Sequence, residues 1–222
     1  MCSLRSTIPT VHASLESSAP PSPGGYEHVE GRNERRGRNT AAVLDATMRL
    51  LVDGVTAPTT KQISESAAVS QRSIFRYFHD VDELITAAVL AQIECFGSYI
   101  SFDPPPQSAP IDERIDYLVQ HRLRQYEAVG PALRAATVRS AQIPTLREIL
   151  TDIRSNARAQ LDALFAPELE GLDEILRPAL VGAIHNVILF EGYDNLVERH
   201  GMGPAQIGGV YRMALRRLLS PA

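Results

Sequence analysis

The segment TTKQISESAAVSQRSIFRYF, residues 59–78, decides the fold of this chain. It predicts two short helices joined by a tight turn. Thr59 and Gln62 have the spacing of a capping box, in which two side chains satisfy free backbone donors at a helix start. Ser70 is a suitable cap for the next helix, which carries polar and cationic side chains. This layout is typical of a helix-turn-helix that places its second helix in the major groove of DNA.

The composition is that of an ordinary globular protein. The chain has 222 residues, of which 44% are hydrophobic and 22% are charged. No apolar run approaches the roughly 20 residues that span a bilayer, and the first residues lack the apolar core of a secretory signal. We therefore expect a cytoplasmic protein without a membrane partner, associated with the nucleoid when it binds DNA.

The distribution of charge favours nucleic-acid binding although the net charge is −4. Residues 31–79 contain eight basic and four acidic residues, whereas residues 80–222 contain 13 basic and 19 acidic residues. A basic module attached to an acidic body suits a DNA-binding protein with a separate regulatory domain, because attraction to phosphate supplies most of the non-specific affinity.

Helical periodicity continues through the rest of the chain, and no segment has a convincing strand pattern. We expect an all-α protein of about nine helices. Residues 1–37 are expected to be a disordered tail with a basic end, 38–86 the helix-turn-helix domain and 87–222 a second helical domain. The first helix is expected to start at Asn39 or Thr40. Pro131 is expected to start a short helix. Residues 172–200 form a long helical pattern that Pro178 is expected to kink or restart.

Several side chains of the helix-turn-helix have the chemistry of DNA contacts. The Gln71 amide can bond adenine in a bidentate manner, and Arg72 or Arg76 can bond guanine or phosphate. Ser73 can bond a phosphate or a base edge. Lys61 stands in the first turn of the preceding helix and is the only lysine of the chain.

The same residues carry a resemblance to a known family. TTKQIS at 59–64, AVS at 68–70, SIFRYF at 73–78 and DEL at 82–84 together resemble the N-terminal domain of TetR-family transcriptional regulators. The resemblance covers residues 40–88. It implies base contacts from Lys61 and Gln71. The other DNA-contact residues that it implies are Thr60, Ser73 and Tyr77, with Arg72 and Arg76 on the same exposed face.

Three residues depart from the family pattern. Ala68 replaces the usual glycine of the turn, where a Cβ is costly if φ is positive. Phe75 replaces a tyrosine whose hydroxyl usually bonds a phosphate. Val81 replaces a lysine at the start of the fourth helix, and the basic segment Arg32–Arg38 could compensate for the lost contacts.

The resemblance implies that the second domain senses a small-molecule effector and forms a dimer through the last two helices. We expect an apolar effector, whose identity the sequence does not reveal. Residues 179–190 are apolar nearly all round, as in a helix buried on all sides. The candidate pocket residues are Phe96, Tyr99, Tyr117, His121, His185 and Asn186, although His185 and Asn186 could equally form core or dimer hydrogen bonds. The candidate dimer residues are Ile184, Ile188, Ile207, Tyr211, Ala214 and Leu218.

The sequence therefore favours a homodimeric repressor that binds palindromic double-stranded DNA and is released by its effector. The alternative is a sensor or interaction protein of the same fold with weak or lost DNA binding, which Phe75 and Val81 motivate. An enzyme is not expected, because there is no glycine-rich phosphate loop or nucleophile elbow. The six histidines have no metal-ligand spacing, so we expect no metal and no cofactor.

Overall fold

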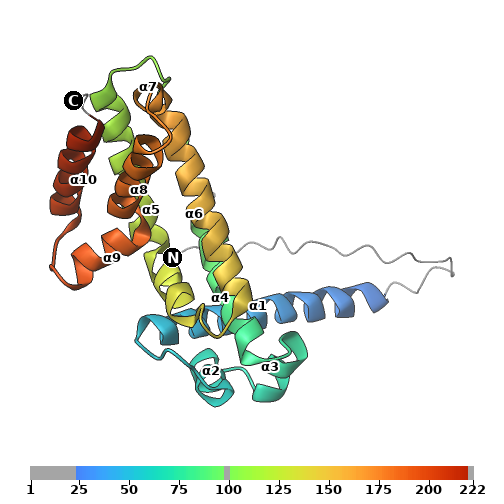
Figure 1. Ribbon diagram of the computed structural model, residues 1–222. Coiled ribbons are helices and arrows are strands. Elements are labelled where there is room, and N and C mark those ends of the chain that lie inside the picture. The colour runs from blue at the N-terminus through green and yellow to red at the C-terminus, as the bar shows by residue number, and fades with distance from the viewer. Residues whose placement is uncertain (1–23, 98–100, 220–222) are drawn as a thin grey trace. The chain divides into compact units, whose positions relative to one another are not determined.

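The structure, a computed structural model, describes residues 24–97 and 101–219 (Figure 1). The candidate pocket residue Tyr99 and the side chain of Phe96 lie outside this part. The described residues form helices and no strands, which confirms the all-α prediction, and ten helices lie within them. They fall into two compact units that divide between Ala91 and Gln92. None of the described helices is both long enough and apolar enough to cross a membrane.

The first unit contains the predicted helix-turn-helix. Its apolar core joins side chains from all of its helices, including Val43, Ile63, Ile74, Phe78 and Leu84. These side chains are each no more than 8% exposed, so the two short helices are fixed by packing against their neighbours. The helices are α1 (Gly24–Val52), α2 (Thr60–Ala67), α3 (Gln71–Tyr77) and the part of α4 (Val81–Gly97) up to Ala91.

The first helix starts much earlier than predicted. Asn39 and Thr40 were the expected start, but α1 begins at Gly24, so residues 24–37 are helical and the expected disorder is wrong for this stretch. Residues 1–23 lie outside the described part. Within the extension, Arg38 and Glu34 form an ion pair one helical turn apart, a spacing that supports helices. The helix was not predicted because this stretch contains few hydrophobic residues. Its side chains are exposed from Glu34 to Arg38.

The turn between α2 and α3 holds a left-handed alanine. Ala68 has φ 53° and ψ 35° and is the only described residue other than glycine with a positive φ. The Val69 amide donates to the Ser64 carbonyl at 3.2 Å, and the Ser64 hydroxyl donates to the Val69 carbonyl at 2.7 Å. These bonds hold the backbone in a conformation that costs an L-residue roughly 1–2 kcal/mol.

The second unit is a bundle built around α5, which packs against α6, α9 and α10. The helix α8 in turn packs against α6, α9 and α10, as Figure 1 shows for α8 and α10. The helices of this unit are α5 (Ile111–Arg139), α6 (Pro144–Leu164), α7 (Ala166–Leu169), α8 (Leu176–Ile188), α9 (Phe190–Glu198) and α10 (Pro204–Leu219).

One predicted helix boundary in this unit is wrong, and one observed boundary was not predicted. Pro131 lies inside α5 and does not start a new helix; the helix continues because Ala132, Leu133 and Ala136 beyond it are buried. The long pattern of residues 172–200 is divided at Leu189, whose backbone is extended (φ −69°, ψ 162°). The turn is tight, because a Cβ on Gly192 would lie 2.8 Å from the Val187 carbonyl oxygen.

Ala68→Gly should stabilise the first unit. Glycine adopts a positive φ without the Cβ penalty, and the Ala68 side chain is exposed, so no packing is lost. We expect the free energy of unfolding to rise by about 1 kcal/mol, measured by chemical denaturation. The control Ala67→Gly, one residue earlier and helical, should lower it by about 0.5–1 kcal/mol. Equal destabilisation by both variants would contradict a left-handed Ala68.

Candidate nucleic-acid interface and ligand cavity

The predicted N-caps are present at the starts of both α2 and α3. At α2, the Gln62 amide donates to the Thr59 hydroxyl at 3.3 Å, and the Thr59 amide donates to the Gln62 side chain at 2.8 Å. At α3, the Ser73 amide donates to the Ser70 hydroxyl at 3.3 Å. The caps satisfy donors that a helix start otherwise leaves free, so the start of α3 is fixed next to its most exposed polar side chains.

The predicted DNA-contact residues gather on α2 and α3. Gln71, Arg72 and Arg76 on α3 and Lys61 on α2 are exposed, whereas Thr60, Ser73 and Tyr77 are half-buried. The Lys61 ammonium lies 4.0 Å from the Glu65 carboxylate, with both side chains in solvent. An exposed pair of this kind is weak, so Lys61 remains available to another anion.

Tyr77 connects α3 to α1. The Arg76 guanidinium donates to the Tyr77 hydroxyl at 2.7 Å, and this bond lowers the pKa of Tyr77 below its ordinary value. The Arg36 guanidinium lies over the Tyr77 ring, 5.7 Å from its centroid, within the range of a cation–π contact. The Arg36 side chain of the extended α1 therefore lies against α3.

The departures from the family pattern lie at the surface. Phe75 is 55% exposed on α3, so a hydroxyl added to its ring would enter solvent or meet a bound partner. Val81, the first residue of α4, is half-buried against the apolar core of this unit. Val81 therefore lacks the positive charge of the family's lysine, but its apolar side chain packs against the core.

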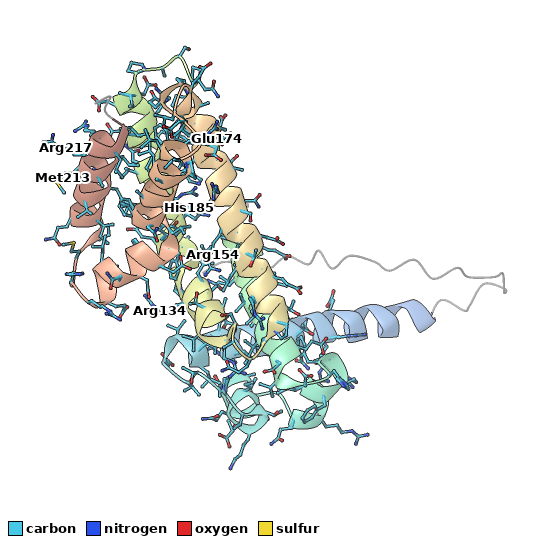
Figure 2. All side chains as sticks on the ribbon, in the orientation of Figure 1. Arg134, Arg154, Glu174, His185, Met213 and Arg217 are labelled. Atoms are coloured by element: carbon cyan, nitrogen blue, oxygen red, sulfur yellow. The ribbon has the colours of Figure 1, made fainter. Side chains whose placement is uncertain are left out.

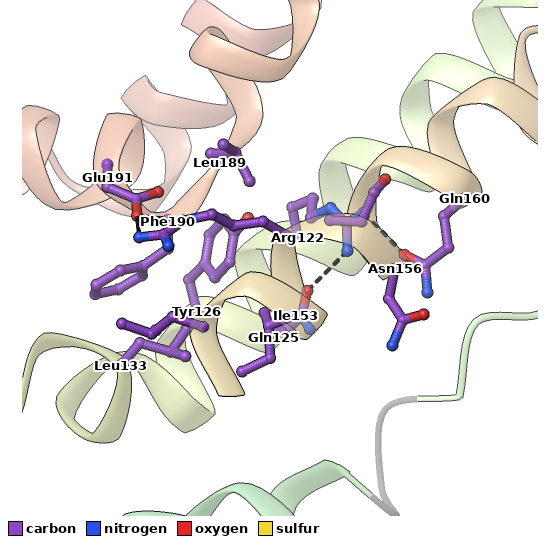
Figure 3. A pocket seen from close by; sticks show the side chains of 13 residues that line it. Arg122, Gln125, Tyr126, Leu133, Ile153, Asn156, Gln160, Leu189, Phe190 and Glu191 are labelled. Atoms are coloured by element: carbon purple, nitrogen blue, oxygen red, sulfur yellow. Dashed lines mark hydrogen bonds and ion pairs between the residues drawn. The ribbon is translucent and has the colours of Figure 1, made fainter. Parts of the chain in front are cut away.

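A partly open cavity of about 180 Å³ lies within the second unit. It is bounded by α5, α6 and the corner between α8 and α9, and Figure 3 shows its lining. Tyr126 fixes this corner, because its buried hydroxyl donates to the Ile188 carbonyl at 2.8 Å. Burial raises the pKa of Tyr126, so the phenol stays protonated.

The residues predicted to form a pocket do not line this cavity where they are described. Tyr117 accepts a bond from the Asp103 amide, and its ring stacks on that of His121 at 6.0 Å between centroids. Burial lowers the pKa of His121 to about 4, and burial also lowers the pKa of His185. Asn186 is exposed and donates to the Gly182 carbonyl at 3.0 Å. His121 is thus a neutral group of the interior, whereas His185 is half-buried.

Arg122, a buried and permanently charged side chain of the cavity lining, was not among the residues predicted from the sequence. It is only 2% exposed. Its position in the sequence could have indicated its burial. It lies one turn after Leu118 and one turn before Tyr126, on a stripe of inward-facing residues. A charge in the middle of such a stripe indicates either a buried partner or a ligand.

The predicted dimer residues need correction. Ile184, Ile188, Ile207 and Tyr211 are each no more than 2% exposed within one protomer, so they belong to its core and cannot contact a second copy. Ala214 and Leu218 are half-buried. The sequence could not separate the two sides of α8, because apolar residues occupy both.

The comparison with known families supports this description. Residues 43–88 match the family described as bacterial regulatory proteins, tetR family. The match runs from the core of α1 to α4 and includes the entire helix-turn-helix. No curated protein matches the chain in a sequence comparison. The helix-turn-helix unit therefore matches the DNA-binding domain of the TetR family, which supports a DNA-binding transcriptional regulator.

Proposed function

We propose that this chain is a homodimeric repressor that binds a palindromic operator and leaves it when a small molecule occupies the second unit. The observation that carries the proposal is the exposure of Gln71, Arg72 and Arg76 on a helix whose opposite side is buried. These side chains have the donors and acceptors that distinguish base pairs in the major groove. The capped α3 presents them from a rigid support.

The extended α1 adds a second basic surface. Arg35, Arg36 and Arg38 are exposed along it, and Arg36 lies against Tyr77 of α3. Arginines that contact phosphates give affinity without sequence preference. This contribution offsets the phosphate contacts that Phe75 and Val81 do not supply, and it favours DNA binding over the alternative of a sensor that has lost it.

Exposed stripes on α8 and α10 support a dimer. On α8, Leu176, Ala179 and Ala183 are exposed at helical spacing, and on α10 the exposed stripe contains Gly209 and Met213. Figure 2 shows Met213 projecting outward from α10. Small residues allow close helix approach, so two copies could form a four-helix interface across a two-fold axis.

A dimer explains how a ligand could release DNA. Half-sites of a palindrome have a fixed spacing of about 34 Å per helical turn, so two recognition helices bind together only at a matching separation. A ligand that favours another separation lowers the affinity for DNA in proportion to its preference for that state. Repression then ends when the ligand accumulates.

The double variant Arg72→Ala plus Arg76→Ala should weaken operator binding by about thirtyfold or more, because each lost contact to a base or phosphate is worth about 1–3 kcal/mol. The operator is first selected from genomic fragments, and affinity is measured by gel-shift titration. Arg124→Ala plus Arg199→Ala removes the same charge from exposed positions of the second unit and should have little effect. Unchanged affinity of the α3 variant would refute the assignment of α3.

Phe75→Tyr should strengthen DNA binding by about three- to tenfold, since one added hydrogen bond is worth about 0.5–1.5 kcal/mol. The ring is exposed, so the hydroxyl carries no burial cost. Phe75→Leu serves as the control and should bring no gain. If selection at low salt enriches no palindrome with either the native chain or Phe75→Tyr, the chain is a sensor without DNA binding.

Ala183→Glu should convert the dimer into a monomer, because it places two like charges in the proposed interface. Sedimentation or light scattering gives the molecular mass, and the affinity for a full palindrome should fall with it. Ala159→Glu, at an exposed position of α6, should remain dimeric. A native chain that is monomeric at micromolar concentration would sink the dimer proposal.

A further inference from the structure

Two arginines on one face of α5 are buried, and their surroundings differ. Arg114 is 3% exposed, and its guanidinium bonds the Glu168 carboxylate through two nitrogens, one of them at 2.7 Å. It also donates to the carbonyls of Ala109 and Leu164, at 3.0 and 2.9 Å. The charge of Arg114 is thus neutralised within the protein, as a buried charge requires.

Arg122, two turns further along α5, has no such counter-charge. Its guanidinium donates to the amide oxygens of Gln125 at 2.9 Å and Gln160 at 2.8 Å, and to the Ala157 carbonyl at 3.4 Å. Its Nε is buried and has no acceptor among the described groups. No carboxylate of the described residues forms an ion pair with it. The two amides orient the cation but leave its charge uncompensated.

The other charges of the cavity do not neutralise Arg122. Glu191 lines the same cavity, but its carboxylate already accepts two bonds from Arg154, at 3.0 and 2.5 Å. Arg154 and Glu191 thus cancel, and the lining keeps the single positive charge of Arg122. Burying an ion costs several kcal/mol unless a partner repays it. The arrangement therefore favours an anion that enters the cavity.

The rest of the lining sets the size and shape of this anion. Leu133, Ile153, Leu189 and Phe190 form an apolar part, and Figure 3 shows Leu133 and Phe190 on the opposite side of Arg122 from Gln160. The volume of about 180 Å³ slightly exceeds the 150 Å³ of an engineered cavity that holds benzene. A molecule with one anionic head and a body of about six carbons fits both parts.

We propose that this cavity binds a small amphiphilic carboxylate, whose head pairs with Arg122 and whose apolar body lies against Leu133 and Phe190. The planar guanidinium matches a carboxylate, and the limited volume excludes nucleotides and other large anions. The identification of this molecule as the effector rests on the proposed function, whereas its binding to the second unit does not. The prediction of an apolar effector thereby becomes one of an amphiphilic acid.

Calorimetric titration of the full chain without DNA tests the proposal with matched probes. Benzoate and hexanoate supply the carboxylate, and benzamide and hexanamide have nearly the same shape without the charge. We expect at least one carboxylate to bind and its amide to bind about tenfold or more weakly, because a hydrogen bond to a charged group is the stronger kind. Equal binding of acid and amide, or no binding of either carboxylate at millimolar concentration, overturns it.

Substitutions then assign the effect to one residue. Arg122→Gln should weaken carboxylate binding about tenfold or more and leave amide binding nearly unchanged, while Arg122→Lys should retain part of the preference. The control Arg124→Gln removes the same charge from an exposed position on the same helix. Undiminished carboxylate binding by Arg122→Gln overturns the proposal. If that variant fails to fold, the acid and amide comparison on the native chain still decides.

DNA binding and carboxylate binding are tested by separate experiments, so either proposal can be refuted without the other. Gel-shift titration without any probe tests DNA binding alone, and calorimetry without DNA tests the cavity alone. If DNA binds and carboxylates do not, only the present inference falls. If carboxylates bind with the expected dependence on Arg122 and no operator exists, the chain is a carboxylate sensor that does not bind DNA.

Discussion

The apolar cluster beneath the helix-turn-helix is the constraint on which the proposed DNA-binding surface depends. The helices α2 and α3 have eight and seven residues, far fewer than the roughly 12–15 at which an isolated helix becomes marginally stable in water. Ile63, Ile74 and Phe78 pack α2 and α3 into the same core as residues of α1 and α4. Because these anchors occupy one side of α3, the polar side chains must occupy the other. The recognition surface is thus a consequence of core packing, and a large-to-small change in this cluster would disturb DNA binding without touching a DNA-contact residue.

The helix-turn-helix of the first unit was predicted well, because its caps depend on residues that are close in sequence. The second unit was predicted less well, because its cavity depends on contacts between residues that are far apart in sequence. The caps at Thr59 and Ser70 depend on side chains three residues apart, so the sequence contains both partners. The cavity has no such local signature, since it forms where α5, α6 and the corner at Leu189 meet. The start of α1 was missed because its polar sequence has no apolar stripe that would predict a helix. The dimer residues were misplaced because an apolar residue on α8 can face either its own core or a second copy.

The two buried arginines of α5 also show that the sequence does not predict contacts between distant residues. Arg114 and Arg122 occupy equivalent positions on one helical stripe, and nothing in their immediate neighbours separates them. The carboxylate that neutralises Arg114 lies 54 residues away on α7, whereas the corresponding partners of Arg122 on α6 are an amide and a carbonyl. Arg114 is therefore a structural bridge, and Arg122 is the position that we propose as the ligand site. The distinction depends on which helix happens to lie opposite, which only the assembled bundle determines.

The scarcity of lysine has a practical consequence. Lys61 is the only lysine of the chain, and its side chain is 75% exposed on α2 beside the recognition helix. Every other cationic side chain apart from histidine is an arginine, which does not react as an amine. A reagent that acylates amines therefore meets a single side chain, and that side chain lies on the surface assigned to DNA. Protection of Lys61 from acylation would report occupancy of this surface directly, and acetylation of the same amine in a cell would remove a positive charge at the point where affinity for phosphate is needed.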